Sequence, residues 1–216
     1  IMHNSVDKLN LIKKEILDSS SNNAAIIAVS KTFPISDILP LINHGHEHFG
    51  ENKIQEAVEK WTDIKCDFTH IKLHMIGKLQ TNKVKYVVPL FDFIHSLDNL
   101  KLAEKISKEQ IKHKKSIKIF IQVNIGQESQ KGGISLDNLE SFYTTCTTKF
   151  GLNIIGLMCL PPDNCDPSSY FLTIKNLNDK LNLKELSIGM SNDYQKALEH
   201  KATFLRIGSK IFGKRD

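Results

Sequence analysis

The chain has 216 residues, of which 40% are hydrophobic and 25% are charged, and its formal net charge is +5. This length supplies enough apolar side chains for one sizeable core, and no apolar stretch approaches the ~18–20 residues that span a membrane. The positive charge comes from lysines spread along the chain, and Arg206 and Arg215 are the only arginines, which argues against a nucleic-acid-binding surface.

Strand-like and helix-like segments alternate from one end of the chain to the other. Apolar residues at helical spacing predict a leading helix over residues 6–17, and short apolar runs predict buried strands. The predicted strands cover residues 24–30, 46–50, 71–77, 92–96, 117–125, 152–158, 185–188 and 203–207. One predicted helix begins after Pro34, with Ser36 as its N-cap. The other predicted helices cover residues 52–61, 81–87, 100–111, 136–147, 169–181, 194–200 and a short segment from Lys210.

Eight β/α units in a chain of this length predict the α/β class and a (β/α)8 TIM-type barrel. No linker rich in Pro, Gly or Ser divides the chain, so we expect one domain over residues 1–216. The alternative is a doubly wound open sheet. The dinucleotide-binding version of that sheet loses support because no Gly-x-Gly-x-x-Gly follows the first strand.

Lys31 ends the first apolar run, and functional groups of a barrel gather at the C-terminal ends of its strands. Ser191 follows the seventh predicted strand and Gly208-Ser209 the eighth, where barrels commonly bind phosphate. Taken singly, each serine is an ordinary helix cap and Lys31 is a strand-end lysine reaching solvent. Taken together, an amine and a phosphate cradle indicate a phosphorylated aldehyde. Pyridoxal 5'-phosphate (PLP), held as an imine on Lys31, is the cofactor we expect.

Arg206 stands out because it lies inside the apolar run 204–207 of a chain that otherwise uses lysine. Strand alternation would put its side chain beneath the ring of a bound cofactor. Because an arginine only donates hydrogen bonds, it would keep the pyridine nitrogen unprotonated and the ring a weak electron sink. The alternative is a buried ion pair between Arg206 and an acid that the sequence does not identify.

The alternating histidines His44, His46 and His48 could chelate a metal ion. No carboxylate or cysteine joins them at ligand spacing, so we expect surface or packing histidines and no metal site.

The cysteines and the first residues bear on the cellular compartment. Cys66, Cys146, Cys159 and Cys165 include no Cys-x-x-Cys pair, which favours free thiols in a reducing compartment. Residues 1–5 are polar and lack the apolar core of a signal peptide. We therefore expect a cytoplasmic protein.

Several stretches resemble signature sequences of the pyridoxal 5'-phosphate homeostasis proteins. They are residues 28–32 (AVSKT), 48–52 (HFGEN), 74–83 (HMIGKLQTNK), 123–125 (VNI), 156–158 (GLM), 186–193 (LSIGMSND) and 206–213 (RIGSKIFG), and they are colinear over nearly the whole chain. The resemblance implies a barrel like the N-terminal domain of alanine racemase. The cofactor-binding residues that it implies are Lys31, Asn52, Met75, Ser191, Arg206, Gly208 and Ser209.

The resemblance also assigns roles to these residues. Lys31 would carry the cofactor, the two serines and Gly208 would hold its phosphate, and Arg206 would face the pyridine nitrogen. Asn52 and Met75 would lie near the ring. The chain departs from the family's usual residues at Lys78, Asn192 and Ser209, and none of these changes removes a needed donor.

Two functions compete. The first is a PLP carrier that takes part in intracellular PLP homeostasis without turnover. The second is a PLP-dependent amino-acid racemase or a related small enzyme, which needs an acid or base on each face of the substrate carbon. Racemases of this fold take the second base from a separate β-domain that we do not expect here, and Tyr194 is the tyrosine to check as a substitute. Arg215 lies too near the chain end to bind a substrate carboxylate.

A third function, phosphosugar binding, leaves Lys31 unexplained. We therefore expect the carrier. Its expected partners are PLP and the apo forms of PLP-dependent enzymes, with no nucleic acid and no membrane, and we expect a monomer or weak dimer.

Overall fold

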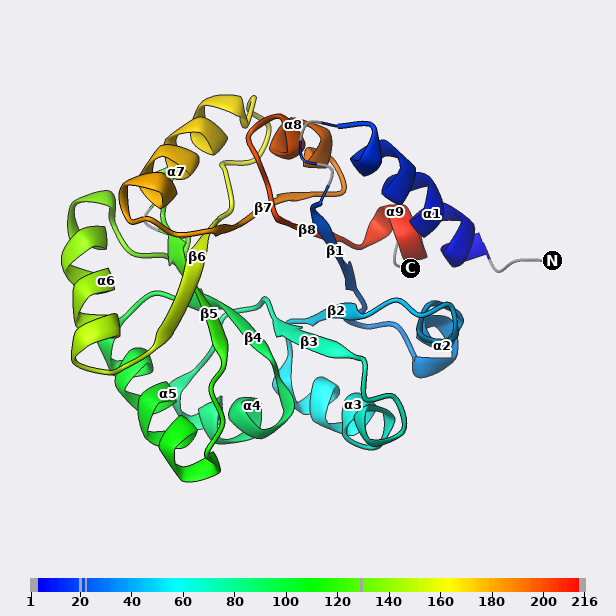
Figure 1. The fold of residues 1–216 in the computed structure, drawn as a ribbon, viewed down its shortest axis with the longest axis horizontal. Coiled ribbons are helices and arrows are strands. Elements are labelled where there is room, and N and C mark those ends of the chain that lie inside the picture. Colours follow the sequence, from blue (N-terminus) through cyan, green and yellow to red (C-terminus); the bar gives the residue numbers. More distant parts are fainter. Residues whose placement is uncertain (1–3, 20, 22, 129, 214–216) are drawn as a thin grey trace.

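Eight parallel strands follow one another around a closed barrel, in which β1 pairs with β8 (Figure 1). The computed structural model describes residues 4–19, 21, 23–128 and 130–213. The strands are β1 (Ala25–Val29), β2 (His48–Glu51), β3 (Lys72–Met75), β4 (Phe93–Leu97), β5 (Lys118–Val123), β6 (Asn153–Cys159), β7 (Glu185–Met190) and β8 (Phe204–Ile207). Closure confirms the predicted (β/α)8 barrel and overturns the open-sheet alternative.

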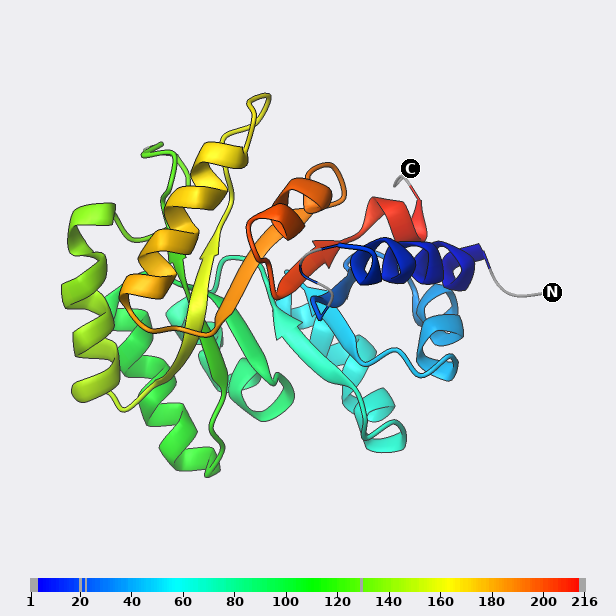
Figure 2. The same cartoon turned by 45° about the horizontal axis from the view of Figure 1, so that its top comes forward.

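Helices cover the outside of the barrel, and α1 lies beside α9 and α2 (Figures 1 and 2). The helices are α1 (Asn4–Leu17), α2 (Ile35–Asn43), α3 (Ile54–Asp67), α4 (Val84–Leu90), α5 (Leu100–His113), α6 (Leu139–Thr148), α7 (Ser168–Lys180), α8 (Tyr194–Glu199) and α9 (Ser209–Phe212). The 3₁₀ turns η1 (Thr81–Lys83) and η2 (Leu136–Asn138) lead into α4 and α6.

The structure corrects several bounds of the predicted elements, and two of these corrections have a local cause. Ser36 does not cap α2, because the helix begins at Ile35 directly after Pro34, whose φ of −67° already suits a helix start. The Ser36 hydroxyl contacts Asp37 instead. The second strand begins at His48, two residues later than predicted, because the ring of His46 folds back and contacts the carbonyl oxygen of His48.

Parts of three predictions fall on residues outside those that the structure describes. Residues 1–3 belong to the stretch that indicated no signal peptide, and Arg215 was set aside as a ligand for a substrate carboxylate. The single domain over residues 1–216 includes both chain ends and stays a prediction.

Strand alternation divides the apolar side chains between two layers. Outward-facing residues pack against the helices in the main core, of which Leu205 is a member. Inward-facing residues form a smaller cluster inside the barrel, consisting of Ile27, Phe93, Phe120, Met158 and Phe204. The interior is therefore filled at its middle, and open space is left to the strand ends.

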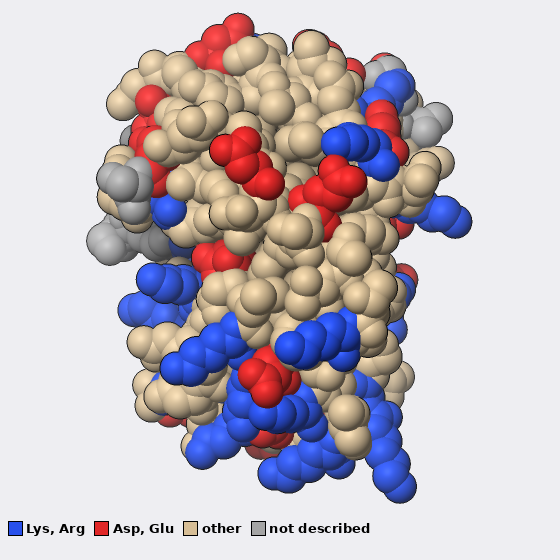
Figure 3. Space-filling model, turned by 90° about the vertical axis from the view of Figure 1, so that its left-hand side faces the viewer, with Lys and Arg blue, Asp and Glu red and all other residues tan. Residues whose placement is uncertain are grey.

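Exposed charges of both signs share the face formed by α5, α6 and α7, with lysines gathered over one half and acidic residues over the other (Figure 3). Exposed ion pairs on these helices include Lys108 with Glu104 and Lys180 with Glu140. Such pairs contribute little to stability. All four cysteines are free thiols, as predicted. Within the described residues, no helix is long and apolar enough to cross a membrane.

Candidate functional site

A cavity of about 910 Å³ lies at the C-terminal ends of the strands. Predicted site residues that line it are Lys31, Asn52, Ser191, Arg206, Gly208 and Ser209. Residues 160–165 after β6 and residues 190–193 at the end of β7 and beyond also line it, and the segments that follow these two strands rise on the same side of the barrel (Figure 2). The fold thus brings together six of the seven residues predicted from the sequence.

Met75 is the exception, and its predicted place near the cofactor ring is corrected. Its side chain is completely buried and belongs to the core between the strands and the helices. Alternation along β3 is the reason, since His74 points into the barrel and Met75 therefore points away from it. Ile76 and Gly77, the next two residues, line the cavity instead.

A buried polar cluster fixes the backbone immediately before Lys31. The Ser30 hydroxyl donates to Oε1 of Glu51 over 2.7 Å. The ammonium of Lys60 donates to the Ser30 carbonyl oxygen at 2.9 Å and to the same Glu51 oxygen at 3.0 Å, and the indole of Trp61 also donates to it. Glu51 is fully buried, so this carboxylate is neutralised by Lys60 rather than by water.

The residue after Lys31 is held as well. Thr32 has a left-handed backbone with φ of 69°, and its N–H donates to Oε1 of Glu56, which also pairs with Lys60. Lys31 itself is partly buried at the cavity wall. Its backbone is therefore set on both sides by one cluster, which the sequence analysis did not identify.

Backbone donors converge on Ser191 at another part of the cavity wall. The N–H groups of Gly208 and Lys210 point to its Oγ at 3.3 and 3.4 Å. Ser191 follows β7, whereas Gly208 and Lys210 follow β8, so two neighbouring loops meet here. Converging N–H groups beside hydroxyls form the kind of concavity that binds a phosphate dianion.

Arg206 enters the cavity from β8 and is 5% exposed. Its Nη1 donates to the Ser187 carbonyl oxygen at 2.8 Å and to Ser187 Oγ at 2.6 Å, and its Nη2 donates to the Cys159 carbonyl oxygen at 3.0 Å. No carboxylate lies within ion-pair distance of it among the residues that the structure describes. The buried ion pair considered as an alternative is therefore absent from this part of the chain, and burial lowers the pKa of the guanidinium.

Asn52 offers an acceptor at the cavity wall. Its Oδ1 is buried and has no hydrogen-bond partner among the described residues. Gly77 packs against it so closely that a Cβ there would lie 2.5 Å from the Asn52 carbonyl oxygen, so only glycine fits. The cavity wall thus offers an amine, a phosphate-type cradle, an arginine with no ion-pair partner among the described residues, and an acceptor without a hydrogen bond there. Together these groups fit the functional groups of PLP.

Tyr194 does not line this cavity. Its hydroxyl donates to Glu15 of α1, and burial together with that carboxylate raises its pKa. The tyrosine considered as a substitute second base therefore points to α1 rather than to the cavity.

The three alternating histidines do not converge either. His44 contacts Asn10, His46 contacts the His48 carbonyl oxygen, and His48 contacts His74. Within the described part of the chain, no cluster of three or more histidine, cysteine or acidic side chains could hold a metal ion.

Comparison with known proteins agrees with this geometry. The sequence model of the family described as alanine racemase, N-terminal domain, matches residues 9–216. A pyridoxal phosphate homeostasis protein of Aquifex aeolicus is 37% identical, over 90% of this chain and 88% of that protein. Another, of Haemophilus influenzae, is 33% identical over 100% of this chain and 96% of that protein.

This chain belongs to the pyridoxal phosphate homeostasis protein family. The resemblance seen in the sequence is therefore confirmed. A solved structure of a family member, PipY of Synechococcus elongatus with PLP bound, has a TM-score of 0.88 and 29% identity, and covers 97% of this chain and 100% of that one. The relatives named here are called homeostasis proteins and not enzymes.

Proposed function

We propose that this chain binds PLP and takes part in PLP homeostasis as a carrier that does not turn over amino acids. The observation that carries the proposal is one cavity lined by Lys31, Arg206 and the Ser191–Gly208 cradle. The names of the relatives and the PLP in the PipY structure support it.

Lys31 supplies the amine that anchors the cofactor. Lys31 would hold PLP through the cofactor's aldehyde, the group that reacts with an unprotonated amine. The backbone bonds on either side of Lys31 hold the amine in place before the ligand arrives. Preorganisation of this kind reduces the entropy lost on binding.

The other residues orient the ligand. Ser191, Gly208 and Ser209 bind the phosphate through hydroxyl and N–H donors, and Asn52 accepts a hydrogen bond beside the ring. Arg206 donates to the ring nitrogen and keeps it unprotonated, since a guanidinium has no proton to give up at neutral pH. The ring then withdraws few electrons from a substrate carbon.

The absence of turnover rests on the groups that line the cavity. A racemase needs an acid or base on each face of the substrate carbon. Lys31 supplies one, and no tyrosine or histidine lines the cavity among the described residues. The cavity is also lined by Asp163, Cys165, Asp193 and Lys196. Lys196 is paired with Asp166, and none of these groups is the tyrosine that racemases of this fold use as the second base.

The test of this proposal has a binding arm and a turnover arm. Purified protein should develop a visible absorption band with PLP, and Lys31→Ala should not, whereas Lys78→Ala, an exposed lysine, should behave as the native protein does. Loaded protein incubated with L- and D-amino acids should racemise none of them. Turnover more than about a thousandfold above free PLP, the scale of one positioned base, would make the chain an enzyme.

We further propose a cytoplasmic location, because four free thiols suit a reducing compartment. Apo forms of PLP-dependent enzymes are the proposed recipients of the cofactor, with the carrier acting as a monomer or weak dimer. Transfer of the cofactor to such an apo-enzyme, measured as recovery of its activity, would test the proposed recipients. Sedimentation analysis would test the oligomeric state.

A further inference from the structure

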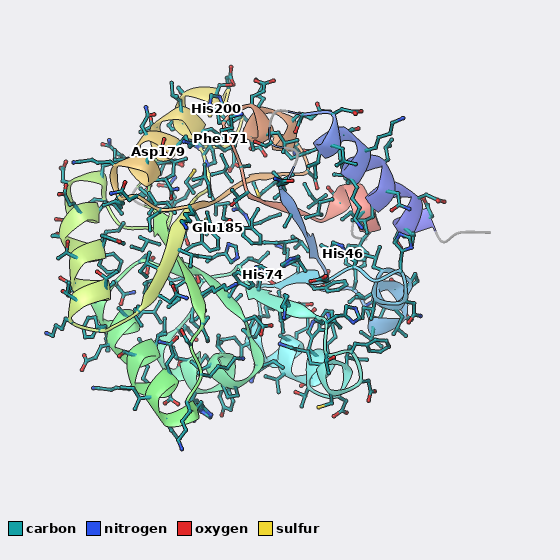
Figure 4. All side chains as sticks on the ribbon, viewed as in Figure 1. His46, His74, Phe171, Asp179, Glu185 and His200 are labelled. Carbon is teal, nitrogen blue, oxygen red and sulfur yellow. The ribbon has the colours of Figure 1, made fainter. Side chains whose placement is uncertain are left out.

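Three histidines from neighbouring strands form a hydrogen-bonded column inside the barrel. Nδ1 of His48 in β2 lies 2.9 Å from Nε2 of His74 in β3. Nδ1 of His74 lies 2.9 Å from Nε2 of His95 in β4. Figure 4 labels His74 inside the ring of strands, where both of these contacts are made.

The column crosses the barrel and ends at Arg206. Nδ1 of His95 lies 2.9 Å from Oγ of Ser187 in β7. That same oxygen accepts the 2.6 Å hydrogen bond from Nη1 of Arg206. A continuous chain of hydrogen bonds therefore runs from His48, which is only partly buried, to the guanidinium at the cavity wall.

The direction of every bond in this chain follows from its arginine end. Arginine can only donate, so Ser187 Oγ accepts from it. Nδ1 of His95 is the other side-chain partner of this oxygen among the described residues, so the buried Ser187 proton is satisfied when it turns to His95. A neutral imidazole has one donor and one acceptor nitrogen, so His95 donates from Nε2 to Nδ1 of His74. The same rule makes His74 donate from Nε2 to His48. All three rings then carry their proton on Nε2.

The surroundings keep these rings neutral. His74 stacks on Phe93 with ring centroids 4.1 Å apart, and His95 stacks on Phe120 at 4.3 Å. Burial lowers the pKa of His74 and His95 well below the usual value, and the charge of Arg206 lowers that of His95 further. Both side chains are fully buried, which a charged imidazolium would not tolerate without a carboxylate partner.

We propose that Ser187, His95, His74 and His48 are positioning residues for Arg206, forming a polarised chain that takes the place of a counter-ion. Ser187 and each of the three rings present their acceptor atom on the side that leads to the guanidinium. The buried cation is thereby stabilised by aligned dipoles, while the nearby carboxylate of Asp193 raises the pKa of Arg206 without forming an ion pair with it among the described residues.

The consequence for the cofactor rests on the proposed function, in which Arg206 faces the pyridine nitrogen. A carboxylate paired with Arg206 would offset its positive charge and make a protonated ring nitrogen less unfavourable. A neutral column adds no such opposite charge, and the carboxylate of Asp193 acts on Arg206 without an ion-pair contact among the described residues. The histidines would thus help to hold PLP in its weakly electron-withdrawing form, as a carrier requires.

The first arm of the test uses the protein without added PLP. With histidine labelled by ¹⁵N, long-range ¹H–¹⁵N spectra at neutral pH report which nitrogen of each ring carries the proton, and His48→Gln, His74→Gln and His95→Gln assign the signals. We expect the Nε2–H form for all three rings. A dominant Nδ1–H form or a charged ring at His74 or His95 would overturn the proposal, whether or not the protein binds PLP.

The second arm breaks the link to Arg206. Ser187→Ala should return the rings to a mixture of both neutral forms and should shift the absorption maximum of bound PLP. Ser96→Ala is the matched control, because Ser96 is equally buried in β4 and its Oγ has no partner among the described residues. Equal maxima and equal ring signals in the native protein and Ser187→Ala would contradict the positioning role. A native protein that shows no PLP band would contradict the proposed function instead. The ring signals would still test the proton positions in the histidine column.

Discussion

The Ser30 hydroxyl donates to the buried carboxylate of Glu51 over 2.7 Å, which ties the end of β1 to the end of β2. The bond lies one residue before Lys31, so the backbone position of Lys31 depends on a side chain from the next strand. Lys60 completes the arrangement by contacting both residues. The buried ion pair therefore acts on the backbone that presents Lys31 and not on the ligand.

Glu51→Gln should destabilise the protein by about 1.5–3 kcal/mol, because it removes the fully buried carboxylate and leaves the Lys60 charge with Glu56 alone among the described carboxylates. Urea unfolding followed by circular dichroism measures this loss. Glu104→Gln is the control, since Glu104 forms an exposed pair with Lys108, and its effect should be close to zero. Equal effects of the two substitutions would show that the Glu51 cluster does not support the fold.

Ser191→Ala should weaken binding of PLP far more than binding of pyridoxal, which lacks the phosphate. A hydrogen bond to a charged group contributes roughly 1.5–3 kcal/mol, so we expect a rise in Kd for PLP of about 10- to 100-fold. Absorption titrations with both ligands measure the change, and Ser141→Ala on the exposed face of α6 serves as the control. A similar loss for both ligands would mean that Ser191 does not contact the phosphate.

Acidification should destabilise the fold below about pH 6.5. Burial lowers the pKa of His46 to about 3, and it also lowers the pKa values of His48, His74 and His95. Below the ordinary value of 6.5 the unfolded chain binds protons that the folded chain does not, so stability is lost as the pH falls. Each such histidine removes up to about 1.4 kcal/mol per pH unit.

Denaturant unfolding between pH 7.5 and pH 5 checks this slope. His46→Gln should make the dependence on pH shallower, because it removes one of the groups that take up a proton on unfolding. Ser141→Ala should leave it unchanged, because it removes no titratable group. Stability that is constant over this range would contradict neutral buried histidines.

The sequence was sufficient to predict the barrel and six of the residues that line the cavity. Lys31, Ser191 and Gly208 follow short apolar runs, and the C-terminal ends of parallel strands meet on one face of a barrel whatever the details of packing. Arg206 was recognised because arginine is rare in this chain. These signals are local, so they do not depend on side-chain contacts.

Features that depend on contacts between strands were not predicted. His48, His74 and His95 lie in three successive strands, and their common inward direction could have been found by aligning the strands in register. The sequence analysis grouped His48 with His44 and His46 instead. The same alternation turns Met75 away from the cavity. The Glu51–Lys60 pair joins a strand to the helix that follows it, and such a contact depends on how the two elements pack.

Mass spectrometric mapping of the lysine that carries PLP tests the central claim most directly. Protein loaded with PLP is reduced with borohydride, digested and searched for the modified peptide, with Lys31→Ala treated in parallel. We predict that the label is found on Lys31 in the native protein and is lost in Lys31→Ala. A label on another lysine of the native protein, or no label at all, would contradict the assignment of Lys31 as the anchor and with it the proposed carrier.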